Sequence, residues 1–493
     1  MRNTIEFVLN GEPRRLEAVD PAITVLRYLR ESERLVGTKE GCAEGDCGAC
    51  TAVVAELEGG GLSYRAVNTC IQFLATLDGK ALITVEQLRG DDRELHPVQQ
   101  ALVDAHGSQC GFCTPGFVMS LFTGVQNAVP PERQDIDDLL AGNLCRCTGY
   151  TPIINAATKV LQPAAKNAFK ARETHIMGLL RRLPANDGVM LESEGRSFIA
   201  PATLQELSET LIEYPQATLL AGGTDVGLFV TKKHIKPEVL VYIGKIQTLS
   251  EIAPCDEGIR IGAGATLDRA WPALVALYPG MNEILRRFGA VQVRNAGTVG
   301  GNIANGSPIG DMPPALIAAG ATLRLRRGDK TRDLPLEEFF LSYGKQDRLP
   351  SEFVESVLVP TPAPDSLLKV YKVSKRLDQD ISAVCGAFNL TFEPARGGPV
   401  VKDARICFGG MAGTPLRADM CEAFLRNKPW NEATASAAQE VLRGCYEPMS
   451  DWRATARYRN QVAGNLLRKY FLEAATHRPI NLAGRGERVP YEA

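Results

Sequence analysis

The sequence predicts a multidomain protein of the α+β class, and three observations support this prediction. The chain has 493 residues, which is enough for about three domains of roughly 150 residues each. Two sets of four cysteines fall in its first third, among short strand-like and helix-like segments. Beyond residue 195, strand and helix patterns alternate, with glycine-dense turns at 221–227 and 297–310. We therefore expect several separate hydrophobic cores.

The charge balance gives no support for a nucleic-acid partner or an anionic membrane, because 55 basic residues nearly cancel 57 acidic ones. No apolar run approaches the ~20 residues of a membrane-spanning helix, and the first residues lack the apolar core of a signal peptide. We therefore expect a cytoplasmic protein. In that compartment, thirteen cysteines argue against a disulfide framework and favour metal ligation.

The first part of the chain is expected to form a small α+β unit. Ile5, Phe7 and Leu9 recur at every second position, which indicates a strand, and Asn10-Gly11 is a hairpin turn signal. A helix is expected over residues 24–35, and further strands over 51–57 and 81–85.

The next part, to about residue 162, is expected to be mostly helical. Thr114-Pro115 and Thr151-Pro152 each follow a cysteine pair, and threonine at an N-cap with proline at the first helical position favours a helix start. A linker, an α/β region that ends near the PTPAP segment, and a smaller α+β region that ends in a helix over 454–475 are expected to follow.

The first cysteine set has the spacing of a plant-type 2Fe–2S cluster. Cys42, Cys47 and Cys50 form C-x4-C-x2-C, and Cys70 follows at a distance. Glycines between these cysteines let the backbone bend around an inorganic core and bring N–H groups close to the sulfurs. The alternative is a zinc site, but zinc prefers paired short spacings such as two C-x2-C motifs.

The second cysteine set consists of two short pairs. Cys110 and Cys113 form CGFC, and Cys145 and Cys147 form CRC. The spacing alone is also compatible with a four-cysteine zinc site. Each pair lies just ahead of a predicted helix N-terminus, however, and the partial positive charge there stabilises an anionic all-thiolate cluster. We therefore expect a second 2Fe–2S cluster.

Two glycine turns in the middle of the chain are candidates for a nucleotide site. The sequences are LLAGGTDVGL at 219–228 and RNAGTVGGNIANGSPIGD at 294–311. Neither matches the Rossmann motif GxGxxG, so they remain open to two interpretations. They are either ordinary tight turns or anion nests for a pyrophosphate. Two iron–sulfur clusters favour the second, because a flavin converts single electrons into pairs.

No catalytic residue is assigned. None of the five histidines forms a metal-like or triad-like group, and the chain has no nucleophile elbow, paired-carboxylate signature or Walker loop. We therefore expect the chain to move electrons and not to perform substrate chemistry itself.

The cysteine and glycine motifs together resemble one family. The segments EGCAEGDCGACTAVV, QCGFCTPGFVMS and NLCRCTGY resemble the iron–sulfur domains of the molybdenum hydroxylases. The glycine turns resemble their FAD domain, and KRLDQDISAV, FGGMAGTPLRA and RYRNQVAGNLL resemble the C-terminal domain of their flavoproteins. The resemblance covers nearly the whole chain. The fusion of these parts, without a molybdopterin domain, is similar to the small subunits of bacterial xanthine dehydrogenases within this family.

The resemblance implies five regions: a β-grasp ferredoxin-like domain (1–88), a four-helix-bundle 2Fe–2S domain (89–163), a linker (164–195), a PCMH-type FAD-binding domain (196–365) and a small α+β C-terminal domain (366–480). It also implies FAD contacts, with Val354 on a looser motif match. These contacts are Leu219, Leu220, Ala221, Gly222, Gly223, Thr224, Asp225, Val226, Phe288, Thr298, Val299, Gly300, Gly301, Asn302, Asp311, Val354 and Lys372.

The function implied by the resemblance is electron transfer in purine catabolism. A large partner subunit would hold the molybdopterin cofactor, facing Gln109, and would oxidise hypoxanthine and xanthine to urate. Electrons would pass through the second cluster, the first cluster and FAD to NAD, in a heterotetramer of two small and two large subunits. The alternatives are the same role in an aldehyde or N-heterocycle hydroxylase, oxygen as the acceptor, or, in a different class, a zinc-stabilised scaffold.

Overall fold

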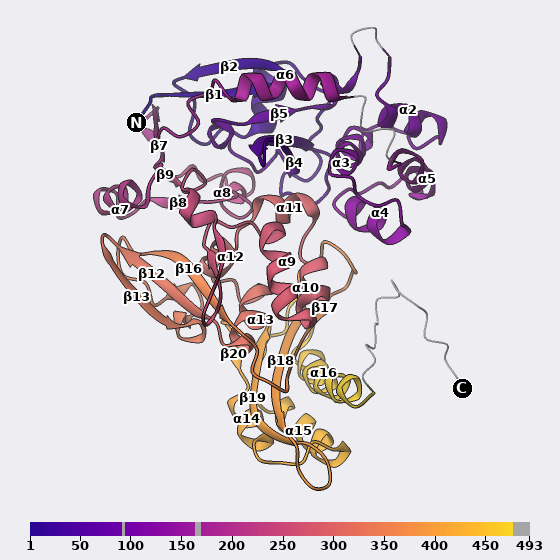
Figure 1. Ribbon diagram of the computed structural model, residues 1–493, viewed down its shortest axis with the longest axis vertical. Helices are drawn as coiled ribbons and strands as arrows, with labels where there is room; N and C mark the ends of the chain where they lie inside the picture. The colour runs from indigo at the N-terminus through magenta and orange to yellow at the C-terminus, as the bar shows by residue number, and fades with distance from the viewer. Residues whose placement is uncertain (91–93, 163–168, 477–493) are drawn as a thin grey trace. The chain divides into compact units, whose positions relative to one another are not determined.

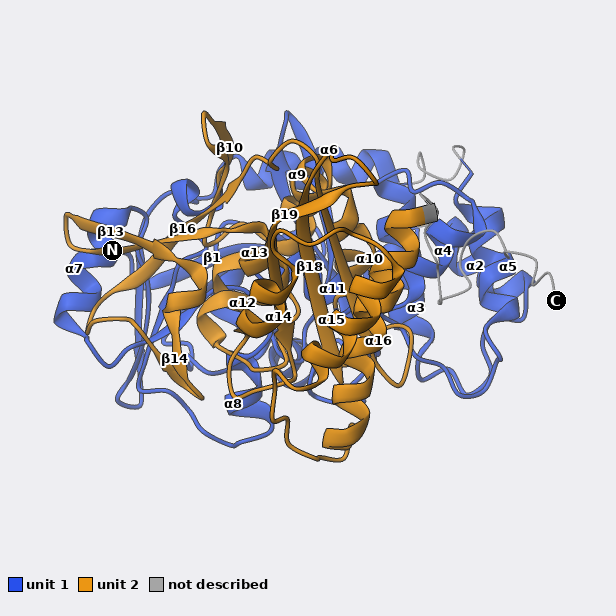
Figure 2. Cartoon of the chain, turned by 90° about the horizontal axis from the view of Figure 1, so that it is seen from below, with its two compact units in different colours: residues 1–250, 289–298 blue, residues 251–288, 299–493 orange. Residues whose placement is uncertain are grey.

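The computed structural model describes residues 1–90, 94–162 and 169–476. Figure 1 labels the helices and strands of the chain, and Figure 2 shows the two compact units into which the chain divides. Unit 1 contains residues 1–250 and 289–298, and unit 2 contains residues 251–288 together with the chain from 299 onward. Both units combine helices with sheets, so the predicted α+β class is confirmed.

Unit 1 begins with the predicted ferredoxin-like fold. Its five-stranded sheet has the order β2-β1-β5-β3-β4. The chain reverses between β1 and β2 at Asn10 and Gly11, whose φ angles of 51° and 80° are those of a two-residue hairpin turn. β1 then pairs in parallel with β5. The strands are β1 (Thr4–Leu9), β2 (Glu12–Glu17), β3 (Thr51–Glu58), β4 (Gly61–Asn68) and β5 (Ala81–Ile83).

The helix expected over residues 24–35 is shorter and less regular than predicted. Thr24 caps a single α-helical turn, α1 (Val25–Arg27), by accepting from the Arg27 N–H. A π-helical turn follows over Tyr28–Ser32, because the Glu33 N–H donates to the Tyr28 carbonyl. The Tyr28 hydroxyl also donates to the Glu33 carboxylate, which Arg14 binds as well. These contacts hold Tyr28 and Glu33 together around the wider turn, which spacing of apolar residues cannot predict.

Four helices form the second part of unit 1, as expected for the helical domain. They are α2 (Pro97–Asp104), α3 (Thr114–Gln126), α4 (Arg133–Leu140) and α5 (Thr151–Val160). From Gly116 to Gln126, α3 is buried on all sides. α3 and α5 begin one residue earlier than predicted, so Cys113 and Tyr150 occupy the N-cap positions.

The rest of unit 1 contains a second sheet of order β6-β7-β9-β8. The region predicted as a linker carries regular structure where it is described, because α6 and β6 lie in it and Ile176 and Leu180 are buried. Hydrophobic residues of the second sheet share a core with the ferredoxin-like sheet. The elements are α6 (Lys170–Leu180), β6 (Val189–Ser193), β7 (Arg196–Ala200), α7 (Leu204–Glu213), β8 (Thr218–Leu220), α8 (Val226–Thr231), β9 (Val239–Tyr242) and α11 (Val291–Ala296).

Unit 2 contains two larger sheets. The first, of order β10-β11-β16-β12-β13, packs with the apolar helix α13, and the second is the antiparallel sheet β17-β18-β19-β20. The strands of unit 2 are β10 (Ile252–Cys255), β11 (Gly258–Gly262), β12 (Thr322–Arg327), β13 (Lys330–Pro335), β14 (Phe340–Ser342), β15 (Lys345–Gln346), β16 (Phe353–Pro360), β17 (Ser366–Val373), β18 (Val384–Glu393), β19 (Val400–Gly409) and β20 (Leu416–Arg417).

The helices of unit 2 are α9 (Leu267–Leu277), α10 (Asn282–Arg286), α12 (Val299–Asn305), α13 (Met312–Ala319), α14 (Asp419–Leu425), α15 (Glu432–Arg443) and α16 (Ala456–Thr476). The last matches the helix predicted over 454–475, whereas residues 477–480 of the predicted C-terminal domain lie outside the described residues. None of the helices in the described ranges has the length and apolar character needed to cross a bilayer.

The aromatic core of unit 2 gives a stability prediction. Phe388 is fully buried, stacks on Tyr470 and meets Phe408 edge to face. We expect Phe388→Ala to lower the free energy of unfolding of unit 2 by about 3–5 kcal/mol, because the cavity adds to the lost burial. All three tryptophans lie in unit 2, so denaturant unfolding followed by tryptophan fluorescence reports on this unit.

The matched control is Leu416→Ala, because the Leu416 side chain is 44% exposed. We expect this change to stay within about 0.5 kcal/mol of the unchanged protein. Equal losses for the two variants would contradict the assignment of Phe388 to the core.

Candidate functional site

The structure brings the first cysteine set together at one end of the ferredoxin-like sheet. The thiol of Cys42 contacts those of Cys47 and Cys70, and Cys70 also contacts Cys50. Three of these cysteines come from the loop before β3, and Cys70 follows β4. β3 and β4 pair along their whole length, from Thr51 opposite Asn68 onward, and this register places the distant cysteine beside the loop.

Backbone groups converge on the sulfur of Cys42. The N–H groups of Glu44, Asp46 and Cys47 lie 3.3–3.4 Å from Sγ. The neighbouring thiols and these N–H groups hold the pKa of Cys42 well below its usual range. The same thiol contacts raise the pKa of Cys70. One thiolate in the set is thus already stabilised by donors that would serve a metal-bound sulfur.

The loop has this shape because of its glycines. Gly45 and Gly48 have φ angles of +78° and +71°, which only glycine adopts without strain. A side chain at Gly48 would place its Cβ 2.1 Å from the Gly142 carbonyl oxygen. The tight cysteine loop therefore also depends on close backbone approach to the segment before Cys145 of the second set.

The second cysteine set is also assembled within unit 1. Cys113 contacts Cys145, and Cys147 contacts Cys110. Each contact therefore joins one cysteine of CGFC to one cysteine of CRC. Burial raises the pKa of Cys113 to about 12, and contact with Cys110 raises that of Cys147. Helix α3 begins directly after Cys113, and α5 begins at Thr151, four residues after Cys147. Cys110 and Cys147 are exposed, as is Gln109.

A backbone hydrogen bond joins the two cysteine sets. The N–H of Leu144 donates to the carbonyl oxygen of Cys47 at 3.0 Å. Cys47, the acceptor, belongs to the first set, and Leu144, the donor, immediately precedes Cys145 of the second set. The two centres that the sequence predicts are therefore neighbours in the fold.

The thiols of each set lie in contact with one another. Zinc draws four sulfurs to about 2.3 Å from one ion. In the described part of the chain, no three His, Cys, Asp or Glu side chains converge on a single metal position. The thiols instead form a chain of contacts in the first set and two cross-pairs in the second. A 2Fe–2S cluster would share the four thiolates of a set between two irons.

The glycine turn at 221–227 packs against the first cysteine set. A Cβ at Gly222 would lie 1.7 Å from the Ala296 carbonyl oxygen, and one at Gly227 would lie 2.4 Å from the Ile71 carbonyl oxygen. Gly223 has a φ of +74° and faces the same carbonyl. Ile71 directly follows Cys70. These glycines are required for backbone contact, whatever else the turn binds.

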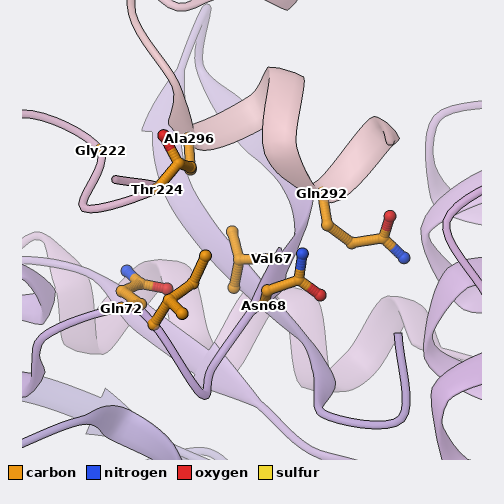
Figure 3. Close-up of a pocket in the computed structure, with 8 residues that line it drawn as sticks. Val67, Asn68, Gln72, Gly222, Thr224, Gln292 and Ala296 are labelled. Carbon is orange, nitrogen blue, oxygen red and sulfur yellow. The ribbon is translucent and has the colours of Figure 1, made fainter. Parts of the chain in front are cut away.

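A small crevice lies where this turn, α11 and the Cys70 loop meet, with room for about one water molecule (Figure 3). Gly222, Thr224 and Ala296 line one side, and Asn68 and Gln72 line the other. The amide oxygen of Gln72 is buried without a hydrogen-bond partner among the described residues. A polar ligand group or a water is expected there, because buried acceptors rarely stay unpaired.

The FAD contacts expected in unit 2 include a buried ion pair. The ammonium of Lys372 lies 2.7 Å from Oδ2 of Asp311, and Ser382 donates to the other carboxylate oxygen. Both charged side chains are less than a tenth exposed. Lys372 also donates to the Arg287 carbonyl, next to Phe288. The pair is thus fully desolvated and hydrogen-bonded, which makes its geometry stiff and its disruption costly.

The remaining expected contacts are distributed over both units. Unit 1 holds Leu219 and Leu220 on β8, the turn from Ala221 to Asp225, Val226 at the start of α8, and Thr298. Unit 2 holds Phe288, the first residues of α12 from Val299 to Asn302, and Val354 on β16. In unit 2, the amide oxygen of Asn302 is buried and has no partner within the described ranges. The chemistry of these groups fits a flavin nucleotide, whose phosphates and ribose offer donors and acceptors.

Sequence reasoning missed a group of buried polar side chains between the two cysteine sets. Gln292, Asn143, Ser120 and Thr51 form one hydrogen-bonded network. Asn143 stands two residues before Cys145, and Thr51 directly follows Cys50. For Asn143 and Thr51, the sequence signal that could have indicated a role was their position near a cysteine. Nothing in the sequence near Gln292 pointed to the cysteine loops.

Four family models match consecutive parts of the chain. They are the 2Fe-2S iron-sulfur cluster binding domain (7–72), the [2Fe-2S] binding domain (84–158), the FAD binding domain in molybdopterin dehydrogenase (192–362) and the CO dehydrogenase flavoprotein C-terminal domain (369–474). The first two matches include all eight grouped cysteines.

Curated relatives support the same family. Xanthine dehydrogenase of Drosophila pseudoobscura pseudoobscura is 33% identical over 89% of this chain. Xanthine dehydrogenase 1 of Arabidopsis thaliana is 32% identical over 88% of the chain. In both cases the match covers 37% of the relative, so the chain spans little more than a third of their length.

Solved structures give a similar result. A carbon monoxide dehydrogenase from Hydrogenophaga pseudoflava is 28% identical, with a TM-score of 0.53, over 57% of this chain and 97% of the matched chain. A quinoline 2-oxidoreductase from Pseudomonas putida 86 is 26% identical, with a TM-score of 0.52, over 56% of this chain and 96% of that one.

These matches, with the geometry of the two cysteine sets, define the class of protein. The chain belongs to the molybdenum hydroxylase family of oxidoreductases and contains its two 2Fe–2S domains and its FAD domain. The predicted family and the predicted iron–sulfur and flavin domains are confirmed.

The glycine turn gives a prediction for flavin binding. We expect Gly222→Ala to lower the amount of FAD that co-purifies with the chain and to reduce the free energy of unfolding by about 1–3 kcal/mol. The reason is that the added Cβ would collide with the Ala296 carbonyl and push the turn from its position. Flavin absorbance per chain and denaturant unfolding measure the two effects.

The control is Gly178→Ala in α6, where an added Cβ would meet open space. This variant should keep its flavin and gain up to about 1 kcal/mol of stability, since alanine favours a helix over glycine. Full flavin content in the Gly222→Ala protein would disprove the proposed need for close approach at this turn.

Proposed function

We propose that the chain is the electron-transfer subunit of a xanthine dehydrogenase, with two 2Fe–2S clusters and FAD as its cofactors. One observation carries the proposal: the two thiol sets and the glycine turn adjoin one another within unit 1. The Leu144–Cys47 hydrogen bond connects the two sets, and Ile71, next to Cys70, touches the glycine turn. The family membership and the relatives named xanthine dehydrogenase support it.

Each cofactor has a defined set of residues in the proposal. Cys42, Cys47, Cys50 and Cys70 hold the first cluster, and Cys110, Cys113, Cys145 and Cys147 hold the second. The contacts expected for FAD are those predicted from the sequence, which lie on β8 and α8 in unit 1 and on α12, β16 and β17 in unit 2. When bound, the clusters carry single electrons and the flavin converts them into pairs.

The residues of the chain perform three tasks in this proposal. The N–H groups around Cys42 donate to the thiolate and favour its deprotonated state. The loop glycines allow the backbones of the two sets to approach closely. The Lys372–Asp311 pair provides a rigid charged edge, because each of its members is already hydrogen-bonded.

The partner and the acceptor are also part of the proposal. A large subunit would carry the molybdopterin cofactor, with exposed Gln109 and Cys110 near it, and the assembly would contain two small and two large subunits. NAD would be the acceptor, and hypoxanthine and xanthine the substrates. A reducing compartment, the cytoplasm, suits eight thiolates that must stay free of disulfides.

A second candidate is the same role in an aldehyde or N-heterocycle hydroxylase. The structural likeness to a quinoline 2-oxidoreductase and to carbon monoxide dehydrogenases favours it. Co-expression with the large subunit, followed by assays of xanthine, aldehydes and quinoline with NAD and with oxygen, separates the candidates. Xanthine-dependent NADH formation is the expected result, and turnover of only another substrate class would reject the proposal in favour of the alternative.

The direct test is metal and flavin analysis of the purified chain. We expect about four irons and about one FAD per chain, as two 2Fe–2S clusters and a flavin require. Electron paramagnetic resonance after reduction should show two distinct iron centres. Stoichiometric zinc without visible colour would instead identify a zinc-stabilised scaffold.

Removal of one ligand should empty one centre only. We expect Cys113→Ala to lower the iron content by about half and to abolish the resonance signal of the second cluster, because an alanine supplies no thiolate. The Cys113 side chain makes no helix-capping hydrogen bond, so the change leaves the start of α3 intact.

The control for this experiment is Cys255→Ala. Cys255 is an exposed cysteine on β10 of unit 2, away from both sets in sequence. The Cys255→Ala substitution should leave both iron centres unchanged. Retention of all iron in the Cys113→Ala protein would show that Cys113 is not a ligand.

A further inference from the structure

We propose that Gln292, a residue of the flavin-domain segment, is a positioning residue that clamps the two iron–sulfur loops to each other. Gln292 lies on α11, is 1% exposed and belongs to unit 1 together with both cysteine sets. It is far in sequence from either set. The inference deepens the proposed function and rests on it only for the identity of the centres that the loops carry.

The hydrogen bonds of the network fix the orientation of the Gln292 amide. The Ser120 hydroxyl donates to Oδ1 of Asn143, and the Thr51 hydroxyl donates to the Gly48 carbonyl. Both hydroxyl protons are therefore committed. The two hydroxyl oxygens and Oδ1 of Asn143 still have lone pairs that can accept. These three oxygens lie 3.2–3.3 Å from Nε2 of Gln292. The NH2 group has two N–H donors, so two of the three acceptors share one proton, whereas a flipped amide would oppose oxygen to oxygen.

The three acceptors belong to the two cysteine regions. Thr51 follows Cys50 of the first set, and Asn143 precedes Cys145 of the second by two residues. Ser120 lies on α3, the helix that begins after Cys113. The amide of Asn143 continues the network by donating to the carbonyl of Gly48, inside the first cysteine loop. A single side chain thus joins both loops through neutral hydrogen bonds.

The backbone around the amide is shaped to receive it. A Cβ at Gly142 would lie 1.8 Å from Oε1 of Gln292, so only glycine leaves space for the amide. A Cβ at Gly116 would lie 2.3 Å from the Gly48 carbonyl oxygen. Both glycines let the loops close around Gln292. The bond that depends most on this closure is the one from the Leu144 N–H to the Cys47 carbonyl.

A clamp from the flavin-domain segment has a functional consequence. The loops of two electron carriers must keep one separation while each carrier changes charge. Neutral donors hold the loops without adding a charge beside either centre. Gln292 would therefore set the contact between the centres with little effect on their individual reduction potentials.

The test replaces Gln292 in the full cofactor-loaded chain with methionine, which is similar in length but has no donor. We expect hydrogen exchange in the peptide that contains Leu144 to become about tenfold faster or more, because two or more buried hydrogen bonds are lost. We also expect slower equalisation of electrons between the two iron centres after photoreduction, followed by rapid-freeze paramagnetic resonance. The midpoint potentials of the two centres should stay unchanged.

The matched control is Asn295→Leu. Asn295 lies on the same helix, is buried, and donates to the Ala66 carbonyl on β4. Among the described residues, its side chain makes no hydrogen bond to the segment before Cys145. Fast exchange at Leu144 in Gln292→Met alone supports the clamp. Equal exchange in both variants would mean a general loosening of α11, and unchanged exchange and electron equalisation in Gln292→Met would mean no clamp. Either result overturns the inference.

Two further outcomes are separable. If the Gln292→Met protein does not fold, Ser120→Ala removes one member of the network instead, and it must make exchange at Leu144 faster than Asn295→Leu does, or the inference fails. If the chain contains no iron, the proposed function fails, but exchange at Leu144 still decides whether Gln292 holds the two loops.

Discussion

The structure of unit 1 depends on close backbone contact between the two cysteine loops. Leu144 donates to the carbonyl of Cys47, and Gly48 packs against Gly142 without any intervening side chain. Two anionic centres on neighbouring loops would repel each other. Neutral hydrogen bonds and the helices that begin after Cys113 and after Tyr150 provide compensating dipoles. The loops can therefore lie side by side without paired charges.

Glycine has a different role in this chain from the one that motifs suggest. In the turn at 221–227 the sequence indicated either an anion nest or an ordinary turn. The contacts of Gly222 with Ala296 and of Gly227 with Ile71 show that the turn is also a packing surface for the Cys70 segment. The same residues thus connect the flavin-domain segment to the first thiol set, since bulkier side chains would separate the two backbones.

Unit 2 holds a pair of opposite charges inside an apolar region. Lys372 and Asp311 are desolvated, and each has a further hydrogen-bond partner. Such a pair contributes little net stability but is costly to break, so it holds a defined geometry. Rigid charge of this kind is suited to a site for a nucleotide cofactor, where flexible surface ions would be screened.

The sequence by itself determined the class of fold, the two thiol sets and the family, because cysteine spacing, glycine turns and hairpin signals are local features. Asn10-Gly11 and the start of α3 after Cys113 could be predicted to within a residue for this reason. Only the tertiary structure decided that Cys113 faces Cys145 and not its sequence partner Cys110, that Tyr28 opens a π-helical turn, and that Gln292 reaches both cysteine loops. Those contacts join segments up to 241 residues apart, and no local pattern encodes which distant donor meets which acceptor.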